Sequence, residues 1–148
     1  NISKFEEIEL KEFSVLFLMI NNLDIFRKNI ELISEINFSK NELNEFKQNF
    51  VDYLLSEKFL DRKKLDQSDF DKRFVDIINL VNNNAPIKII SKQKSDEDIM
   101  IMFYEIKAEI EKIRLKVRIE SLEDKVSLNL DEKLYSELLS LRNQLKGG

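Results

Sequence analysis

Carboxylates and basic side chains are almost the only groups in this sequence that could do chemistry, because its 148 residues include no His and no Cys. The chain therefore offers no imidazole or thiolate metal ligand and none of the usual nucleophile and base pairs. Asp66, Asp69 and Asp71 could suggest a cation-binding loop, but the turn-forming Gly and bidentate Glu of a calcium loop are missing. We expect these aspartates to cap helices, and we predict no metal, no other cofactor and no catalytic residue in this segment.

Basic residues form the second candidate group, at positions 62–64, 72–73 and 88–94, near Phe70 and Phe74. Basic patches beside exposed aromatic rings can bind single-stranded nucleic acid. Here the net charge is −4, which has the wrong sign for neutralising phosphates, and both Phe side chains fall on the predicted inward face of a helix. We expect a solvated basic face and no strong direct binding of nucleic acid.

Helices must position these side chains. Gly 2 and Pro 1 are too few for the many turns of a β-sandwich, and 43% apolar with 35% charged residues is typical of a globular chain. The longest apolar run, Val15 to Ile20, is far shorter than the roughly 20 residues of a membrane span. We therefore expect an all-α protein with no membrane association and a cytoplasmic location. The chain begins at Asn1 without a Met, which suggests a segment of a longer polypeptide.

Apolar residues at three- and four-residue spacings predict an N-terminal bundle of about six helices over residues 1–95. The helix at residues 10–20 is apolar nearly all round and is expected to run through the centre of the core. Asn22 is expected to cap a shorter and broken second helix. Residues 39–42 (SKNE) match a capping box, and Ser68 with the Asp three residues later is expected to begin a further helix.

Residues 96–148 are predicted to form a C-terminal two-helix hairpin. A start signal at residues 95–98 (SDED) precedes the longest helix, which must reverse near residues 125–129. Apolar residues spaced 4, 3, 4, 3 and 4 along it are typical of a coiled-coil-like seam: Ile99, Phe103, Ile106, Ile110, Ile113 and Val117. The same spacing recurs in the final helix at Leu134, Leu138, Leu141 and Leu145, where Leu138 and Leu141 are expected to hold the hairpin closed.

Apolar residues outside this seam suggest a binding surface on the hairpin. Leu130, Tyr135 and Leu139 lie beside the seam of the last helix, and two helices cannot bury apolar residues that lie off their mutual contact. A polar rim follows them, and the predicted partner-binding residues are Tyr135, Leu139, Arg142, Asn143 and Lys146. The alternative is that Tyr135 and Leu139 simply pack against the preceding bundle.

Two stretches of the sequence carry a family resemblance. Residues 12–26 (EFSVLFLMINNLDIF), with Phe38 and Ser39 and the helix after them, resemble the start of the C-terminal domain of bacterial DnaG-type DNA primases. Residues 113–128, then DEKL at 131–134 and LRNQL at 141–145, are similar to the terminal hairpin of that family. The resemblance covers nearly the whole chain and consists of helix patterns in a shared order rather than catalytic signatures.

The resemblance implies a six-helix bundle followed by a helical hairpin, a fold shared with the N-terminal domain of DnaB-type replicative helicases. It also implies a function, which is to bind the helicase N-terminal domain and so bring a primase to the replication fork within a primosome. The parent chain would then be a nucleotidyltransferase that makes primers, with polymerisation and zinc binding in other domains. In some bacteria the bundle also receives single-stranded DNA-binding protein, but Glu12 and Phe13 stand where basic residues of that site are expected.

Two other functions stay open at this point. The chain could be a helical scaffold that self-associates through the apolar seam at residues 99–117. It could also be the N-terminal domain of a replicative helicase itself.

Overall fold

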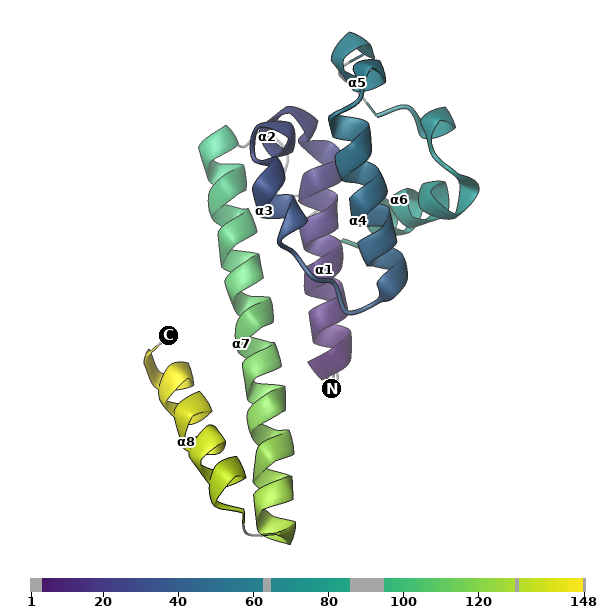
Figure 1. Cartoon of the computed structure of the whole chain (residues 1–148). Helices are drawn as coiled ribbons and strands as arrows, with labels where there is room; N and C mark the ends of the chain where they lie inside the picture. The colour runs from purple at the N-terminus through teal and green to yellow at the C-terminus, as the bar shows by residue number, and fades with distance from the viewer. Residues whose placement is uncertain (1–3, 63–64, 86–94, 130, 148) are drawn as a thin grey trace.

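The computed structural model describes residues 4–62, 65–85, 95–129 and 131–147, and it gives no side-chain detail for residues 4, 5, 61 and 62. Every regular element in these ranges is helical, as the sequence predicts. Figure 1 shows a bundle at one end and a long helix that leaves it to form a hairpin at the other. None of the helices in the described ranges is long and apolar enough to cross a membrane.

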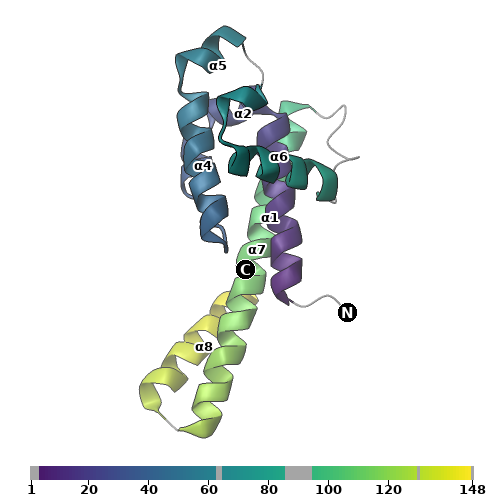
Figure 2. The same cartoon turned by 90° about the vertical axis from the view of Figure 1, so that its right-hand side faces the viewer.

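Helix α1 (Lys4–Asn21) is the central element of the bundle, with α7 on one side and α6 on another (Figure 2). Val15, Leu16, Leu18 and Met19 are each at most 1% exposed, so consecutive residues, and hence every face of the helix, are covered. This confirms the predicted path through the centre of the core. An all-round apolar surface is stable only where neighbours enclose the whole helix.

The second predicted helix is broken at Asn29 into α2 (Leu23–Lys28) and α3 (Ile30–Ser34). Asn29 ends α2 through its side chain, which donates a hydrogen bond to the Ile25 carbonyl oxygen at 2.8 Å. Asn22 stands at the N-cap position of α2 but makes no side-chain cap there. Its amide instead donates to the Leu18 carbonyl oxygen at 2.9 Å, so it stabilises the end of α1 rather than the start of α2.

Helix α4 (Asn41–Leu54) begins without the predicted capping box. Lys40 occupies the N-cap position, and Ser39 lies one residue too early to cap. The Ser39 backbone N–H and hydroxyl both donate to the Glu12 carboxylate, at 2.7 and 3.2 Å. A long-range contact to a buried acid has therefore replaced the local cap that the sequence pattern favoured.

The rest of the bundle comprises α5 (Glu57–Arg62), a 3₁₀ turn (Gln67–Asp69) and α6 (Lys72–Asn84). Asp66 caps the turn by accepting from the Ser68 N–H at 3.0 Å, and Asp71 stands at the N-cap position of α6. Ser68 therefore lies inside the turn and does not begin the helix. Of the basic positions considered in the sequence analysis, residues 63–64 and 88–94 lie outside the described residues.

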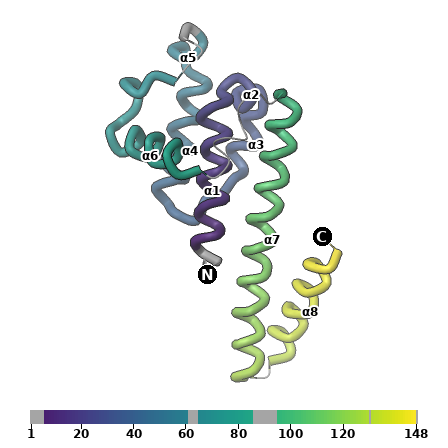
Figure 3. The backbone as a smooth tube through the Cα atoms, turned by 180° about the vertical axis from the view of Figure 1, so that it is seen from behind, coloured from purple at the N-terminus to yellow at the C-terminus, as the bar shows by residue number. Residues whose placement is uncertain are grey.

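Helix α7 (Asp96–Leu128) joins the two parts of the molecule and begins as predicted, with the Ser95 hydroxyl accepting from the Asp98 N–H at 3.1 Å. Its 33 residues span about 50 Å at the usual 1.5 Å rise. Figure 3 shows its N-terminal half beside the bundle and its C-terminal half beside α8 (Glu132–Gly147), which runs back antiparallel to it.

Two separate hydrophobic clusters divide the chain, and the division lies inside α7. Ile99, Phe103 and Ile110 belong to the bundle core, with Ile113 packed against that core. The second cluster comprises Ile119, Leu122 and Leu138, with Leu115, Val126, Leu134, Leu141 and Leu145 packed against it. The packing partner of α7 therefore changes near Arg114, within the segment 96–148 that the sequence analysis treated as one part. The apolar spacing of residues 99–113 gave no sign that its partner was the bundle.

Candidate functional site: the helical hairpin

The seam of the hairpin forms from the residues that the sequence predicts. Leu138 is 3% exposed and meets Ile119 and Leu122, each 6% exposed. The other three seam leucines of α8 are partly buried on either side of Leu138. α8 is thus held on α7 by one narrow apolar stripe, and most of its circumference faces solvent.

Tyr135 and Leu139 lie outside this seam and remain accessible, at 47% and 42% exposed. They are four residues apart and so share a face of α8. Each follows a seam leucine by one residue, which places this face about 100° around the helix axis from the seam. Neither is buried on the bundle, which removes the alternative explanation for their apolar character. Arg142, Asn143 and Lys146 follow on the same side and are all exposed.

Ion pairs border the hairpin seam on both sides. Arg142 lies 3.3 Å from the Glu123 carboxylate of α7, and Arg118 of α7 pairs with Glu137 of α8. Arg142 and Glu123 are each 45% exposed, and solvent-exposed pairs of this kind contribute at most about 1 kcal/mol. Of the five predicted binding residues, Arg142 therefore has an intramolecular partner that an incoming protein must share or displace.

The sequence analysis did not single out three further exposed apolar side chains of α7. Leu128, at the end of α7, is 88% exposed, and Ile101 and Tyr104, in the bundle half, are 47% and 49% exposed. The available signal was that none of the three belongs to the predicted seam of that helix. Leu130, which the sequence placed beside the hairpin seam, lies outside the described residues.

Arg73, one of the basic residues considered for nucleic-acid binding, has structural contacts. Arg73 pairs with Glu45 at 3.0 Å and stacks over the Phe74 ring at 4.5 Å. Phe70 and Phe74 are 8% and 3% exposed, so, as predicted, neither ring is free to stack on a base. Within the described ranges, no three His, Cys, Asp or Glu side chains are grouped so that they could hold a metal ion.

A buried carboxylate lies where the two parts of the chain meet, and the sequence analysis did not identify it as a site. Glu12 of α1 is 1% exposed. Its Oε2 accepts three hydrogen bonds, from the Ser39 backbone N–H, from the Ser39 hydroxyl and from the Arg114 guanidinium at 2.9 Å. Arg114 also donates to the Ser39 hydroxyl at 3.2 Å. The cluster therefore ties α1, the segment before α4 and the midpoint of α7 together.

Burial raises the pKa of Glu12 above its ordinary value, against the lowering effects of the Ser39 hydrogen bonds and the Arg114 charge. Desolvation of the charged form is thus larger than the compensation that these partners supply. Sequence reasoning had little to distinguish this site, because Glu12 is one of four glutamates in α1 and lies next to the apolar run of that helix.

The chain matches no protein-family model, no curated protein and no solved structure. The arguments for its function therefore rest on its own residues and their geometry.

Proposed function

We propose that this chain is the helicase-interaction domain of a bacterial DNA primase and that its hairpin binds the N-terminal domain of a DnaB-type replicative helicase. The observation that carries the proposal is the exposed Tyr135 and Leu139 pair on a hairpin that projects from a helical bundle. The bundle, hairpin and order of elements agree with the resemblance noted in the sequence.

The interaction would be a non-covalent docking of one helix face. Large apolar side chains with a polar rim are typical anchors of protein interfaces, and Asn143 and Lys146 supply polar groups at the rim. Tethering a primase to the advancing helicase would raise its local concentration at the unwound template. On this proposal the segment itself has no catalytic role and no cofactor, and synthesis of primers belongs to the rest of the parent chain.

Isothermal titration calorimetry of this chain with the helicase N-terminal domain from the same organism tests the proposal. Tyr135→Ala and Leu139→Ala should each cost about 1 to 2 kcal/mol of binding if these side chains are central anchors. Leu80→Ala is the matched control, because Leu80 is equally exposed, at 48%, but lies on α6 of the bundle. Unchanged affinity of both hairpin variants would remove the assignment.

Self-association is the second candidate, and it needs a different surface from the one the sequence suggested. Ile99, Phe103 and Ile110 of the predicted seam are at most 6% exposed inside their own bundle, so a second copy cannot reach them. An interface between copies would need exposed apolar side chains instead, such as Tyr135, Leu139 or Leu128. Sedimentation equilibrium separates the candidates, since a stable homodimer that Tyr135→Ala dissociates would favour the scaffold.

A further inference from the structure

A cavity of about 220 Å³ opens between α1, the segment that joins α3 to α4, and the middle of α7. Val15, Ile36, Phe38 and Ile110 supply its apolar walls, and Glu12 is among its lining residues. The volume lies below the roughly 300–1,000 Å³ of pockets that enclose drug-sized ligands, yet it exceeds the roughly 30 Å³ of one water molecule several times. The cavity is therefore of a size to receive a single large side chain.

The Glu12 carboxylate has acceptor capacity left for a ligand. All three of its hydrogen bonds end on Oε2, and no donor among the described residues reaches Oε1. A carboxylate has about four acceptor sites over its two oxygens. Since the side chain is 1% exposed and lines the cavity, the natural route to Oε1 is through this cavity.

The charges at the mouth favour a cation. Glu35 and Glu111 line the cavity with Glu12, against the two basic residues Lys107 and Arg114. Arg114 is already bound to Glu12 Oε2, and neither Glu35 nor Glu111 has an ion pair with another described residue. Burial already raises the pKa of Glu12 despite Arg114, so a second cation would compensate a charge that remains partly uncompensated.

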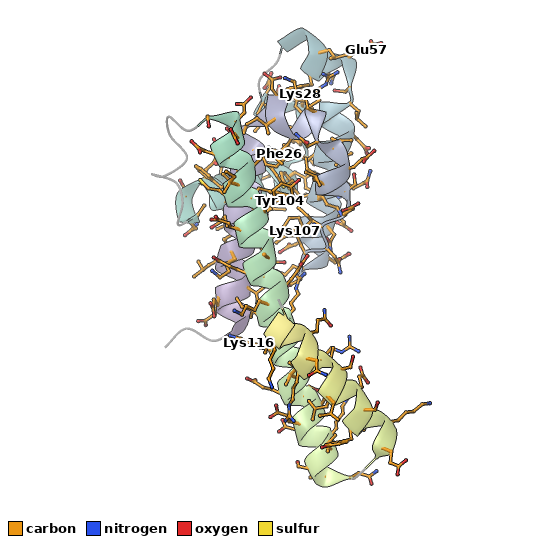
Figure 4. The ribbon with its side chains drawn as sticks, turned by 90° about the vertical axis from the view of Figure 1, so that its left-hand side faces the viewer. Phe26, Lys28, Glu57, Tyr104, Lys107 and Lys116 are labelled. Carbon is orange, nitrogen blue, oxygen red and sulfur yellow. The ribbon has the colours of Figure 1, made fainter. Side chains whose placement is uncertain are left out.

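A second cavity lies next to the first and shares one lining residue with it. It has a volume of about 400 Å³ and is lined by residues 28–32, among them Lys28 and Glu31, by Tyr104 of α7 and by Glu35, which also lines the first. Figure 4 shows Tyr104 and Lys107 on the side of α7 that faces α2 and α3, and Lys116 on its opposite side. Because they share Glu35 and take their other walls in part from successive turns of α7, we interpret the two cavities as neighbouring parts of one groove, which is longer than a free alkylamine can fill.

We propose that this groove binds a segment of a partner polypeptide and that the smaller cavity receives one Lys or Arg side chain of that segment. The alkyl stem would lie against Ile36, Phe38 and Ile110, and the charged head would bind Glu12 Oε1, with Glu35 and Glu111 at the mouth. The site lies beside the bundle and does not include the hairpin face proposed for the helicase. It therefore adds a second binding function to the chain and does not depend on the first.

Nuclear magnetic resonance titration of the ¹⁵N-labelled chain tests the proposal with three probes. The first is a blocked nonapeptide of Ala and Ser that contains one Lys and, four residues away, one Leu. The second has norleucine in place of Lys, and the third is n-butylammonium. The Lys peptide should shift the backbone amides of Ser39 and Glu111 in a saturable way and bind at least tenfold more tightly than either of the other probes.

Three variants locate the binding. Glu12→Gln should weaken the Lys peptide at least tenfold, and circular dichroism verifies that this variant still folds. The double variant Glu35→Gln/Glu111→Gln changes only exposed side chains, and it should weaken the peptide at least threefold. Glu105→Gln is the control for Glu111, because it removes one carboxylate from α7 without lining either cavity, and it should bind like the parent.

Several outcomes would overturn the proposal. Equal affinity for the norleucine peptide would show that the site does not recognise a cation. Equal affinity for n-butylammonium would show a small-amine site rather than a polypeptide groove. The proposal would also fail if no probe gave saturable shifts at Ser39 and Glu111, or if the Glu35→Gln/Glu111→Gln variant bound like the Glu105→Gln control.

Discussion

Truncation of Leu138 should release the hairpin while leaving the bundle folded. Leu138 is 3% exposed and is the central contact of the small second cluster, which shares none of its members with the bundle core. A helix of 16 residues is marginal by itself in water. The ordered state of α8 therefore depends on the seam that Leu138 anchors.

The size of the effect follows from the packing. Substitution of a buried Leu by Ala costs about 2 to 5 kcal/mol, and least where the surroundings can collapse into the cavity. A two-helix seam with solvent on both sides collapses more easily than a closed core, so we expect about 2 to 3 kcal/mol for Leu138→Ala. At about 1.4 kcal/mol per tenfold change, the opening equilibrium of α8 should rise on the order of 30- to 150-fold.

Native-state amide hydrogen exchange measures this opening residue by residue. In Leu138→Ala, the amides of α8 should exchange faster by that factor, while the amides of Leu16 and Leu18 in α1 should keep their parental rates. Leu139→Ala is the matched control, because it makes the same change at the next position, where the side chain is 42% exposed. Its effect should stay within about 0.5 kcal/mol.

One result would refute this reasoning. If Leu138→Ala accelerated exchange in α1 and α8 by equal factors, the two clusters would unfold as one unit. The hairpin would then not be an independently stabilised element.

Three further predictions concern the start of α7 and the buried cluster at its midpoint. Ser95→Ala removes the N-cap of α7 and should lower the free energy of unfolding, measured by urea denaturation, by about 1 kcal/mol. The control Ser121→Ala, at an exposed position inside α7, should change this free energy little. Equal losses in the two variants would contradict the cap. Burial raises the folded-state pKa of Glu12 above its ordinary 4.5, so the folded state binds the carboxyl proton more tightly than the unfolded state does. The stability that this proton contributes is therefore fully present below about pH 4.5, and it is lost as pH rises through the folded-state pKa. The free energy of unfolding of the parent minus that of Glu12→Gln should therefore increase as pH falls from 7 toward 4.5, and parallel pH profiles would contradict it. Arg114→Ala leaves the Glu12 carboxylate buried without its cation. At pH 7 this substitution should therefore lower the free energy of unfolding more in the parent than in the Glu12→Gln background. A double-mutant cycle with no coupling energy between the two residues would contradict the pairing.

The sequence predicted those features that depend on local pattern. The all-round apolar run of α1 placed that helix at the centre of the core, and the seam leucines of α8 placed its contact with α7. The cap at Ser95 was predicted correctly because its hydrogen bond joins Ser95 to Asp98, only three residues later. In the cap and along each apolar pattern, every residue that carries the sequence signal lies about one helical turn from the next.

The errors arise where a distant residue outcompetes a local partner. Ser39 has the spacing of a capping box, but it hydrogen-bonds Glu12, which is 27 residues away in the sequence. The apolar spacing from Ile99 to Ile113 fits a coiled coil, yet it packs on its own bundle. Periodicity shows that a face is buried, but it does not identify the partner that buries it.

The candidate binding residues also include one part that the sequence could predict and one part that it could not. The exposure of Tyr135 and Leu139 could be predicted, because a two-helix seam has a fixed width and leaves the neighbouring positions open. The cavity beside Glu12 could not, because its walls come from α1, from residues 35–38 and from α7. No sequence spacing relates these three segments.

Calorimetric titration of the helicase N-terminal domain with the parent chain and the Tyr135→Ala/Leu139→Ala double variant tests the central claim most directly. We predict measurable binding by the parent and by Leu80→Ala, and at least tenfold weaker binding by the double variant, whose hairpin should still be protected from hydrogen exchange. Equal affinity of the parent and the double variant, or no binding by the parent, would contradict the claim that the exposed face of this hairpin recognises a replicative helicase.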